Sequence, residues 1–160
     1  MHYSTFDSPL GELLAVGDGN ALHGLYMQEG RTAIAVDRDW EPADEPFADL
    51  RTQLTEYFDG ARTAFDVPLA LTGSAFQRRV WRALQDIPYG ETASYGAIAG
   101  RLGVPSAARA VGVANRQNPM CVIVPCHRVI GADGSLTGYG GGLARKRLLL
   151  ELESGVLAIS

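Results

Sequence analysis

The sequence predicts a mixed α/β (α+β) protein made of two units, a small sheet-plus-helix unit followed by a mainly helical unit. Three observations support this prediction. Strand and hairpin patterns fill the first half, helical spacing of apolar residues dominates the second half, and the net charge changes sign between them. With 160 residues, 46% hydrophobic and 20% charged, the chain is large enough to form a core without disulfide bonds or metals.

Residues 1–72 are expected to form the N-terminal domain. A hairpin turn signal at Gly17-Asp18-Gly19-Asn20 separates two of its strands. Apolar residues at helical spacing predict one helix over 47–58, which Gly60 ends. Four short runs are expected to be strands: 2–7, 12–16, 21–27 and 65–71. No pattern in this unit is typical of a catalytic site, so we interpret it as a scaffold.

Residues 73–160 are expected to form the C-terminal domain, in which helices predominate. Ser74 can cap a first helix over 75–86. A last helix is expected at about 143–155, with leucines on its inner face.

Between these two helices the sequence predicts a pair of short helices joined by a tight turn. The first is expected over 95–102, and the second follows Val104-Pro105-Ser106, where Ser106 can act as its cap. The positions expected on the inner face of the second helix are Ala107, Ala110, Val111 and Ala114. The positions expected on its outer face are small, polar or cationic: Ala108, Arg109, Gly112, Asn115 and Arg116. This slim face fits a helix-turn-helix that contacts nucleic acid, although an ordinary helical corner fits the pattern equally well.

The two domains are expected to carry opposite net charges. Residues 1–72 contain four arginines and thirteen acidic residues, for a net charge of −9, whereas residues 73–160 contain ten basic and five acidic residues, for +5. Together they give the formal net charge of −4. Only the second domain therefore suits a polyanionic partner, unless the split is a chance distribution of solvated charges.

The composition disfavours several functional classes. No apolar run approaches the roughly 20 residues that a membrane-spanning helix needs. The first residues lack the basic and apolar regions of an export signal. Two cysteines and three histidines are too few for a disulfide framework or a cysteine-rich zinc site. We therefore expect a cytoplasmic protein with reduced thiols, no membrane contact and no bound metal.

The segment Met120–Gly131 contains the candidate nucleophile, Cys126, beside His127. Cys121–Val124 is expected to be a buried strand that Pro125 ends, which leaves the cysteine and histidine at the strand end. An adjacent imidazole can activate a thiol, which is only a few per cent thiolate at neutral pH. Because neighbours in an extended segment point in opposite directions, a bridging water is the expected link. The alternative is a buried structural cysteine beside a surface histidine.

A nucleophile and its base usually need a third group that orients the base. Glu153, at the margin of the apolar face of the last helix, is the expected partner of His127, although a solvated acidic residue fits its position as well. Ahead of that helix, the run Gly138–Gly142 permits positive φ angles and exposes N–H groups that could donate to a leaving heteroatom. The run lacks the residue order of nucleotide-binding P-loops.

These residues resemble a known family, the O6-alkylguanine-DNA alkyltransferases, also called methylated-DNA–protein-cysteine methyltransferases. The resemblance is strong over about 74–153 and weak over the N-terminal part. Six segments carry it: Tyr89-Gly90-Glu91-Thr92, Ser94-Tyr95, Ala107–Gly112, Asn118-Pro119, Ile123–Val129 and Gly138–Leu143. It implies a ribonuclease-H-like sheet-plus-helix domain followed by a winged-helix-type domain with a helix-turn-helix.

The resemblance implies direct repair of alkylated DNA by an irreversible transfer that uses each protein molecule once. Cys126 would take the alkyl group from O6-alkylguanine, and less readily from O4-alkylthymine. His127 would accept the thiol proton through water, and Glu153 would orient His127. Tyr95 would donate its hydroxyl to the flipped base, and Asn118 would connect the recognition helix to the active-site strand.

The resemblance also implies a substrate pocket and a DNA-binding face. The pocket residues would be Val129, Tyr139, Gly140 and Met120. The Gly140 N–H would face O6, while the carbonyls of Cys126 and Val129 would read the exocyclic amine. The DNA-binding residues would be Arg109, Ala108, Gly112, Arg116 and Ser106. The helix-turn-helix would lie in the minor groove, with Arg109 filling the gap left by the extruded nucleotide.

The implied partner is double-stranded DNA that contains O6-alkylguanine. The protein is expected to bind it as a monomer, on the nucleoid, and to need no cofactor. Whether several molecules assemble cooperatively on DNA stays open.

Two departures from the family concern the pocket. Gly140 stands where mammalian members carry serine, and Cys121, interpreted as a packing residue, stands where they carry proline. Two rival functions are a thiol hydrolase with a Cys-His-Glu triad, which would turn over, and a helix-turn-helix protein that binds without chemistry.

Overall fold

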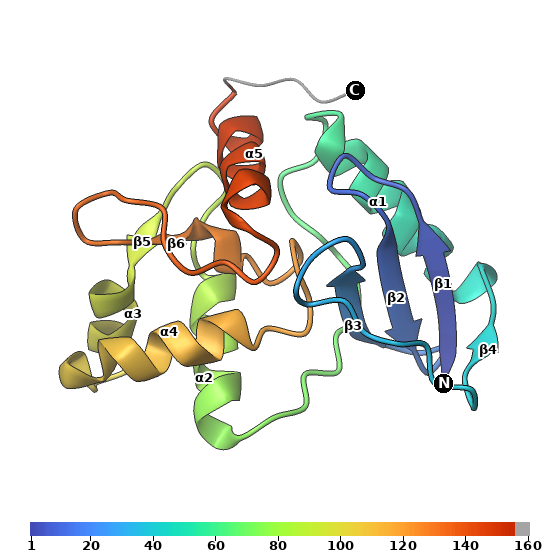
Figure 1. The fold of residues 1–160 in the computed structure, drawn as a ribbon, viewed down its shortest axis with the longest axis horizontal. Helices are drawn as coiled ribbons and strands as arrows, with labels where there is room; N and C mark the ends of the chain where they lie inside the picture. The colour runs from blue at the N-terminus through green and yellow to red at the C-terminus, as the bar shows by residue number, and fades with distance from the viewer. Residues whose placement is uncertain (156–160) are drawn as a thin grey trace.

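The computed structural model describes residues 1–155, in which a sheet-and-helix unit packs against a mainly helical unit (Figure 1). The expected mixed α/β fold class is confirmed. The end of the expected C-terminal domain, residues 156–160, lies outside the described residues. Buried residues of both units form one hydrophobic cluster, so the two units share a core. Within residues 1–155 no helix is both long and apolar enough to cross a lipid bilayer.

The N-terminal unit is a four-stranded sheet in the order β3-β2-β1-β4. Its strands are β1 (His2–Phe6), β2 (Leu13–Gly17), β3 (Leu22–Met27) and β4 (Glu41–Pro42). Strand β2 pairs antiparallel with both β1 and β3, while the short β4 pairs parallel with β1. The 3₁₀ turn η1 (Glu45–Phe47) leads into helix α1 (Ala48–Phe58), which lies across one face of the sheet (Figure 1). β3 is therefore an edge strand, and it faces the helical unit.

One expected strand, residues 65–71, does not form. An isolated bridge joins Leu69 to Leu22, where Leu22 N–H donates to Pro68 O at 2.8 Å and Ala70 N–H donates to Leu22 O at 2.8 Å. Pro68 has no N–H to donate, so the pairing does not extend into a ladder.

Within the described range the C-terminal unit contains four α-helices: α2 (Ala75–Gln85), α3 (Tyr95–Arg101), α4 (Ala108–Arg116) and α5 (Leu143–Glu153). Each lies where apolar spacing predicts a helix. Ser74 caps α2 as expected, because its hydroxyl accepts from Gln77 N–H at 3.1 Å and the Gln77 side chain accepts from Ser74 N–H at 2.9 Å. A short parallel pair, β5 (Ala93–Ser94) and β6 (Val129–Ile130), joins the start of α3 to the segment after Cys126.

The turn between α3 and α4 differs from the expectation. Pro105–Ala107 form a 3₁₀ turn, η2, and α4 begins without a side-chain cap, so the capping role expected of Ser106 is wrong. The buried face of α4 also differs from the expectation: Ala110 is exposed, whereas Gly112 and Asn115 are buried. The exposed positions of α4 are therefore Arg109, Ala110, Val113 and Arg116.

Candidate active site

The segment that leads to Cys126 is attached to the edge of the N-terminal sheet. Leu25 N–H donates to Pro119 O at 2.8 Å, Cys121 N–H donates to Leu25 O at 3.2 Å, and Met120 forms a parallel bridge with Leu25. These bonds satisfy backbone groups that the edge strand β3 would otherwise leave unpaired. The N-terminal unit thus positions the active-site segment directly.

Asn118 folds the following residues into a turn. Its Oδ1 accepts from Met120 N–H at 2.9 Å, and its Nδ2 donates to Val124 O at 2.8 Å and to Met120 O at 3.3 Å. Val122 has a φ of 69°, a left-handed conformation that β-branched residues rarely adopt. The prediction of a buried strand over Cys121–Val124 is therefore wrong, because hydrogen bonds from the Asn118 side chain take the place of strand pairing.

Cys126 and His127 lie in a 3₁₀ turn, η3 (Cys126–Arg128), and not at the end of a strand. Arg128 N–H donates to Pro125 O at 3.0 Å, which closes this turn. Cys126 is 6% exposed and His127 is fully buried. The turn therefore buries His127 completely and leaves a small part of Cys126 exposed.

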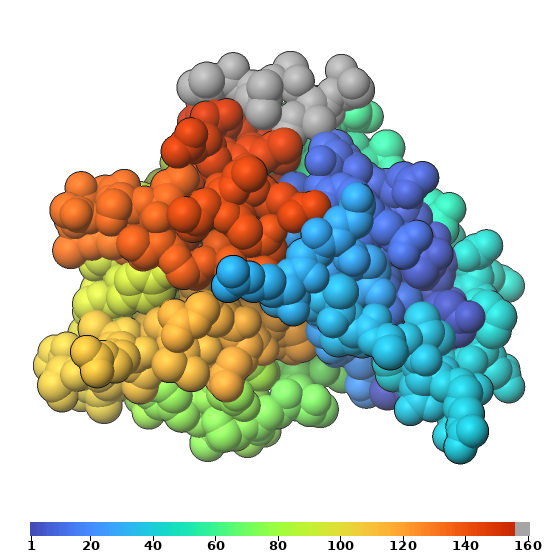
Figure 2. All heavy atoms as spheres, in the orientation of Figure 1, coloured from blue at the N-terminus to red at the C-terminus, as the bar shows by residue number. Residues whose placement is uncertain are grey.

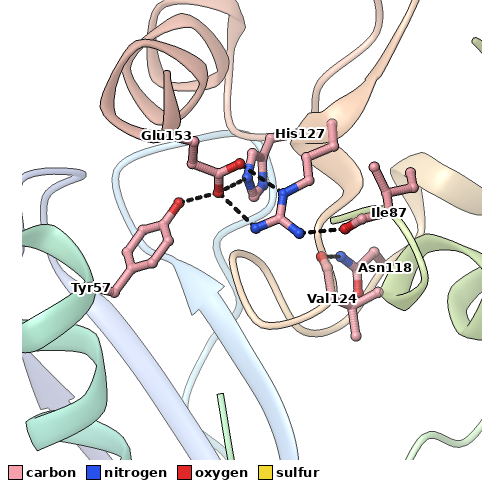
Figure 3. A network of polar contacts seen from close by, with 7 residues as sticks. Tyr57, Ile87, Asn118, Val124, His127 and Glu153 are labelled. Atoms are coloured by element: carbon pink, nitrogen blue, oxygen red, sulfur yellow. Dashed lines mark hydrogen bonds and ion pairs between the residues drawn. The ribbon is translucent and has the colours of Figure 1, made fainter. Parts of the chain in front are cut away.

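A buried polar network surrounds Glu153 (Figure 3). His127 Nε2 lies 2.7 Å from Glu153 Oε2, so the structure brings this expected pair together. Arg128 donates Nε to Oε1 at 2.7 Å and Nη2 to Oε2 at 2.9 Å. The Tyr57 hydroxyl, from α1, donates to Oε2 at 2.5 Å. Sequence reasoning missed Arg128 and Tyr57; the arginine beside the Pro-Cys-His motif is a signal that could have identified the first.

This network keeps Glu153 ionised, while burial favours a neutral His127. Burial by itself raises the pKa of Glu153, but hydrogen bonds from His127 and Arg128 lower that pKa to about 2. Burial lowers the pKa of His127 and outweighs the opposite effect of Glu153. Among the described residues, His127 Nδ1 is buried and has no hydrogen-bond partner. A neutral imidazole that donates Nε2–H to Glu153 therefore presents Nδ1 as a proton acceptor.

A buried lysine supplies positive charge near Cys126. Burial raises the pKa of the Cys126 thiol, while hydrogen bonding by Asn118 and the charge of Lys146 oppose that rise. Lys146 is fully buried and donates Nζ to Val129 O at 2.5 Å and to Thr137 O at 2.8 Å. Burial lowers the pKa of Lys146 to about 8. Sequence reasoning missed this residue, although its spacing from the buried leucines of α5 places it on the inner face of the helix.

A cavity of about 30 Å³ lies beside Cys126, between the two units. The C-terminal unit lines it with Asn115, Arg116, Asn118, Cys121, Cys126, Gly138, Tyr139, Gly140 and Gly141. The N-terminal unit lines it with Leu25, Tyr26, Met27 and Thr32. Tyr139 and Gly140 are therefore in the expected pocket. The lining does not include Met120 and Val129, which are fully buried.

Tyr95 lies between the helix-turn-helix and the glycine-rich segment. Its hydroxyl donates to Thr137 O at 3.0 Å. Its ring covers Gly112, where a Cβ would lie 3.6 Å from Tyr95 Cδ1. Gly112 is thus buried by Tyr95, which contradicts its expected place on the DNA-binding face.

The other residues expected to contact DNA remain accessible. Arg109, Arg116 and Ser106 are exposed, and Ala108 is half-buried. Arg116 also lines the cavity beside Cys126, so it connects this face with the candidate active site.

Both cysteines are free thiols. Cys121 also lines the cavity, and burial raises its pKa well above the ordinary value. In residues 1–155, no group of three or more histidine, cysteine, aspartate and glutamate side chains is arranged to hold a metal ion.

Two family models together match nearly the whole chain. The model for the 6-O-methylguanine DNA methyltransferase ribonuclease-like domain matches residues 1–71, and the model for the DNA binding domain of the same family matches residues 75–155. A methylated-DNA–protein-cysteine methyltransferase of Mycobacterium tuberculosis is 56% identical over 153 residues, covering 96% of this chain and 92% of the relative. One from Methanosarcina acetivorans is 50% identical over 153 residues, covering 96% and 98%.

Solved structures agree with these matches. The crystal structure of M. tuberculosis OGT in complex with DNA is similar with a TM-score of 0.91 and 54% identity, covering 98% of this chain and 94% of that chain. An O6-methylguanine-DNA methyltransferase of the archaeon Pyrococcus kodakaraensis has the same fold, with a TM-score of 0.66 at 23% identity, covering 95% and 98%. The chain therefore belongs to the 6-O-methylguanine DNA methyltransferase family.

Proposed function

We propose that this protein repairs O6-alkylguanine, and less readily O4-alkylthymine, by moving the alkyl group irreversibly to Cys126. The observation that carries the proposal is the arrangement around this thiol: it lines a cavity and neighbours a buried imidazole whose Nε2 lies 2.7 Å from Glu153. Relatives named methylated-DNA–protein-cysteine methyltransferases support the same reaction. No cofactor is required, because the lesion itself supplies the alkyl group.

His127 prepares the thiol for attack. The thiol proton passes through a bridging water to His127 Nδ1, the ring nitrogen that accepts no other hydrogen bond within the described residues. Glu153 stabilises the imidazolium that forms, and Arg128 and Tyr57 hold the carboxylate in place. Lys146 offsets part of the charge of the thiolate.

The thiolate then attacks the alkyl carbon. A carbon–sulfur bond forms as the carbon–O6 bond breaks, and the bonding electron pair goes to the guanine. The proton released from the thiol balances the proton that the guanine takes up. Tyr95 donates its hydroxyl to the base after leaving Thr137 O, and the Gly140 N–H faces O6. The thioether is not hydrolysed, so each molecule reacts once.

The C-terminal domain, residues 73–160, binds duplex DNA through the minor groove, and the N-terminal domain, residues 1–72, supports the active-site segment. A base inside a duplex is out of reach, so the target nucleotide is flipped out and Arg109 fills the gap. Ala108, Ser106 and Arg116 contact the backbone beside it. The protein acts as a monomer in the cytoplasm, on the nucleoid.

Intact-mass spectrometry tests the reaction. After incubation with a duplex containing O6-methylguanine, we expect each molecule to gain the mass of one methylene, located on Cys126 by peptide mapping. Cys126→Ala should gain nothing, while Cys121→Ala should react like the wild type. Label on Cys121, or continuing release of product beyond one equivalent, would refute the proposal; the second result would favour the thiol hydrolase.

A separate comparison tests the role of Arg109. Arg109→Ala should slow repair of duplex DNA by about tenfold or more, because extrusion of the base costs a few kcal/mol that this side chain helps to offset. Reaction with free O6-benzylguanine base should be unchanged, since no nucleotide has to be extruded. Equal losses on both substrates would contradict an inserted arginine.

A further inference from the structure

The N-terminal unit closes one side of the cavity at Cys126. Residues 28–34 leave β3 and lie against the glycine-rich segment before α5; in Figure 2 the light-blue atoms of this loop meet the orange and red atoms of the C-terminal unit. A Cβ at Gly30 would lie 3.6 Å from the Cα of Gly141. Two segments far apart in the sequence therefore form the outer wall of the cavity.

Both sides of this wall are held by hydrogen bonds. On the N-terminal side, Gln28 Nε2 donates to Ile34 O at 2.7 Å and Ile34 N–H donates to Gln28 Oε1 at 3.1 Å, which closes the loop. On the other side, Arg145 donates to Gly141 O at 3.1 Å and to Leu10 O at 2.9 Å. These bonds fix the shape of each side of the wall.

Thr32 fills the space beside Gly140. A Cβ built on Gly140 would lie 2.5 Å from Thr32 Cγ2, while the nearest atom of another residue is Arg116 O at 3.8 Å. The cavity has a volume of about 30 Å³, enough for about two or three water molecules. A group attached to Cys126 Sγ has to occupy this space. A group as large as benzyl exceeds this space and has to displace side chains of the lining, of which the Thr32 methyl group is one.

We infer that Thr32 is a specificity-determining residue that limits the size of the alkyl group accepted by Cys126. The inference rests on the proposed alkyl transfer to this thiol. The Thr32 methyl group, held in the closed loop, lies against Gly140 in the lining of the cavity. Methyl groups are therefore transferred readily and benzyl groups slowly. The determinant belongs to the N-terminal domain, which thus selects substrate in addition to supporting the fold.

Matched variants of Thr32 test the inference. Thr32→Ser removes the methyl group and keeps the hydroxyl, whereas Thr32→Val keeps the methyl group. Rate constants for adduct formation on Cys126 are measured with two duplexes of the same sequence, containing either O6-methylguanine or O6-benzylguanine. We expect Thr32→Ser to raise the benzyl-to-methyl ratio of rate constants by about tenfold, the effect of one carbon in an apolar pocket, and Thr32→Val to leave it unchanged. An unchanged ratio in Thr32→Ser overturns the inference.

Gly140→Ala tests the contact without relying on the reaction. Its Cβ would meet Thr32 Cγ2, so we expect a lower melting temperature than that of the wild type. The double variant Gly140→Ala with Thr32→Ser should regain most of the loss, because the obstructing methyl group is absent. Equal losses in the single and double variants overturn the inference. If the wild-type protein gains no mass with either duplex, the proposed function is refuted. The melting temperatures still report on the contact between Thr32 and Gly140, because they do not depend on the reaction.

Discussion

The two units of the molecule bury different kinds of side chain. Within the described residues of the N-terminal unit, the buried side chains are mainly apolar, and the polar ones are Ser4 and Gln53. Gln53 exchanges hydrogen bonds with the backbone of Asp66, at 2.8 and 3.0 Å, and serves the fold alone. The C-terminal unit buries five polar or charged residues: Asn115, His127, Arg128, Lys146 and Glu153. The fold therefore concentrates buried charge where Cys126 lies.

This difference has an energetic consequence. Moving ions out of water costs several kcal/mol each, and a buried pair regains this only through good geometry and further hydrogen bonds. Glu153 has both, because it accepts from His127, Arg128 and Tyr57. The C-terminal unit should therefore be sensitive to the loss of single polar groups, whereas the sheet should respond mainly to the loss of apolar volume.

The sharpest test of this comparison is Glu153→Gln. It removes the charge that Arg128 needs while keeping the side-chain shape, so we expect a loss of about 3–5 kcal/mol in the free energy of unfolding. Urea denaturation measures this loss. Glu151→Gln, on the same helix and only half-buried, is the matched control and should stay within about 0.5 kcal/mol of the wild type. A loss below about 1 kcal/mol for Glu153→Gln would remove the energetic distinction between the units.

The same carboxylate predicts how stability depends on pH. The pKa of Glu153 is about 2 in the folded protein against an ordinary 4.5, so its contribution is complete above about pH 4.5 and is lost as the pH falls toward 2. Burial also lowers the pKa of His127, so protonation of this ring opposes folding in the same direction. Between pH 2 and 4.5, the free energy of unfolding should change more with pH in the wild type than in Glu153→Gln. If the free energy of unfolding changes with pH equally in both proteins, Glu153 is not the group responsible.

Tyr57→Phe probes the point where the two units share the network. The variant loses a hydrogen bond to a charged group and leaves the ring packing intact, so we expect a cost of about 1.5–3 kcal/mol. Tyr3→Phe, at a half-buried tyrosine of β1, serves as the control and should cost less than about 0.5 kcal/mol. Equal effects of the two substitutions would mean that Tyr57 acts only by packing.

The smallest expected effect concerns a helix end. Ser74→Ala removes the capping box of α2 and should cost about 1 kcal/mol. Ser106→Ala should cost almost nothing, because Ser106 caps no helix in the structure. If denaturation shows a larger loss for Ser106→Ala than for Ser74→Ala, the result would support the capping role that the sequence predicts for Ser106.

The parts of the fold that the sequence predicts are those encoded by near neighbours. The helix α2 follows from apolar spacing and from Ser74 with Gln77 three residues later. The strand expected over Cys121–Val124 fails because Asn118, outside that run, supplies side-chain hydrogen bonds that the apolar pattern does not contain.

The candidate site shows the same limit. The Glu153–His127 contact is anticipated by helix spacing and by the family resemblance, and it is present at 2.7 Å. Tyr57 and Thr32 reach the site from a different unit, through tertiary packing that no local pattern encodes. Lys146 is missed because a single lysine on an inner helix face is usually assigned to solvent.

The hydrogen bonds that join Leu25 to Pro119 and Cys121 have a practical meaning for protein engineering. They use main-chain atoms alone, so a domain exchange keeps this attachment when it preserves an edge strand of the right length and twist, whichever side chains that strand carries. Chimaeras that keep this edge strand should retain a correctly aligned acceptor sulfur. Isolated second halves, lacking it, should expose unpaired peptide groups and associate with one another.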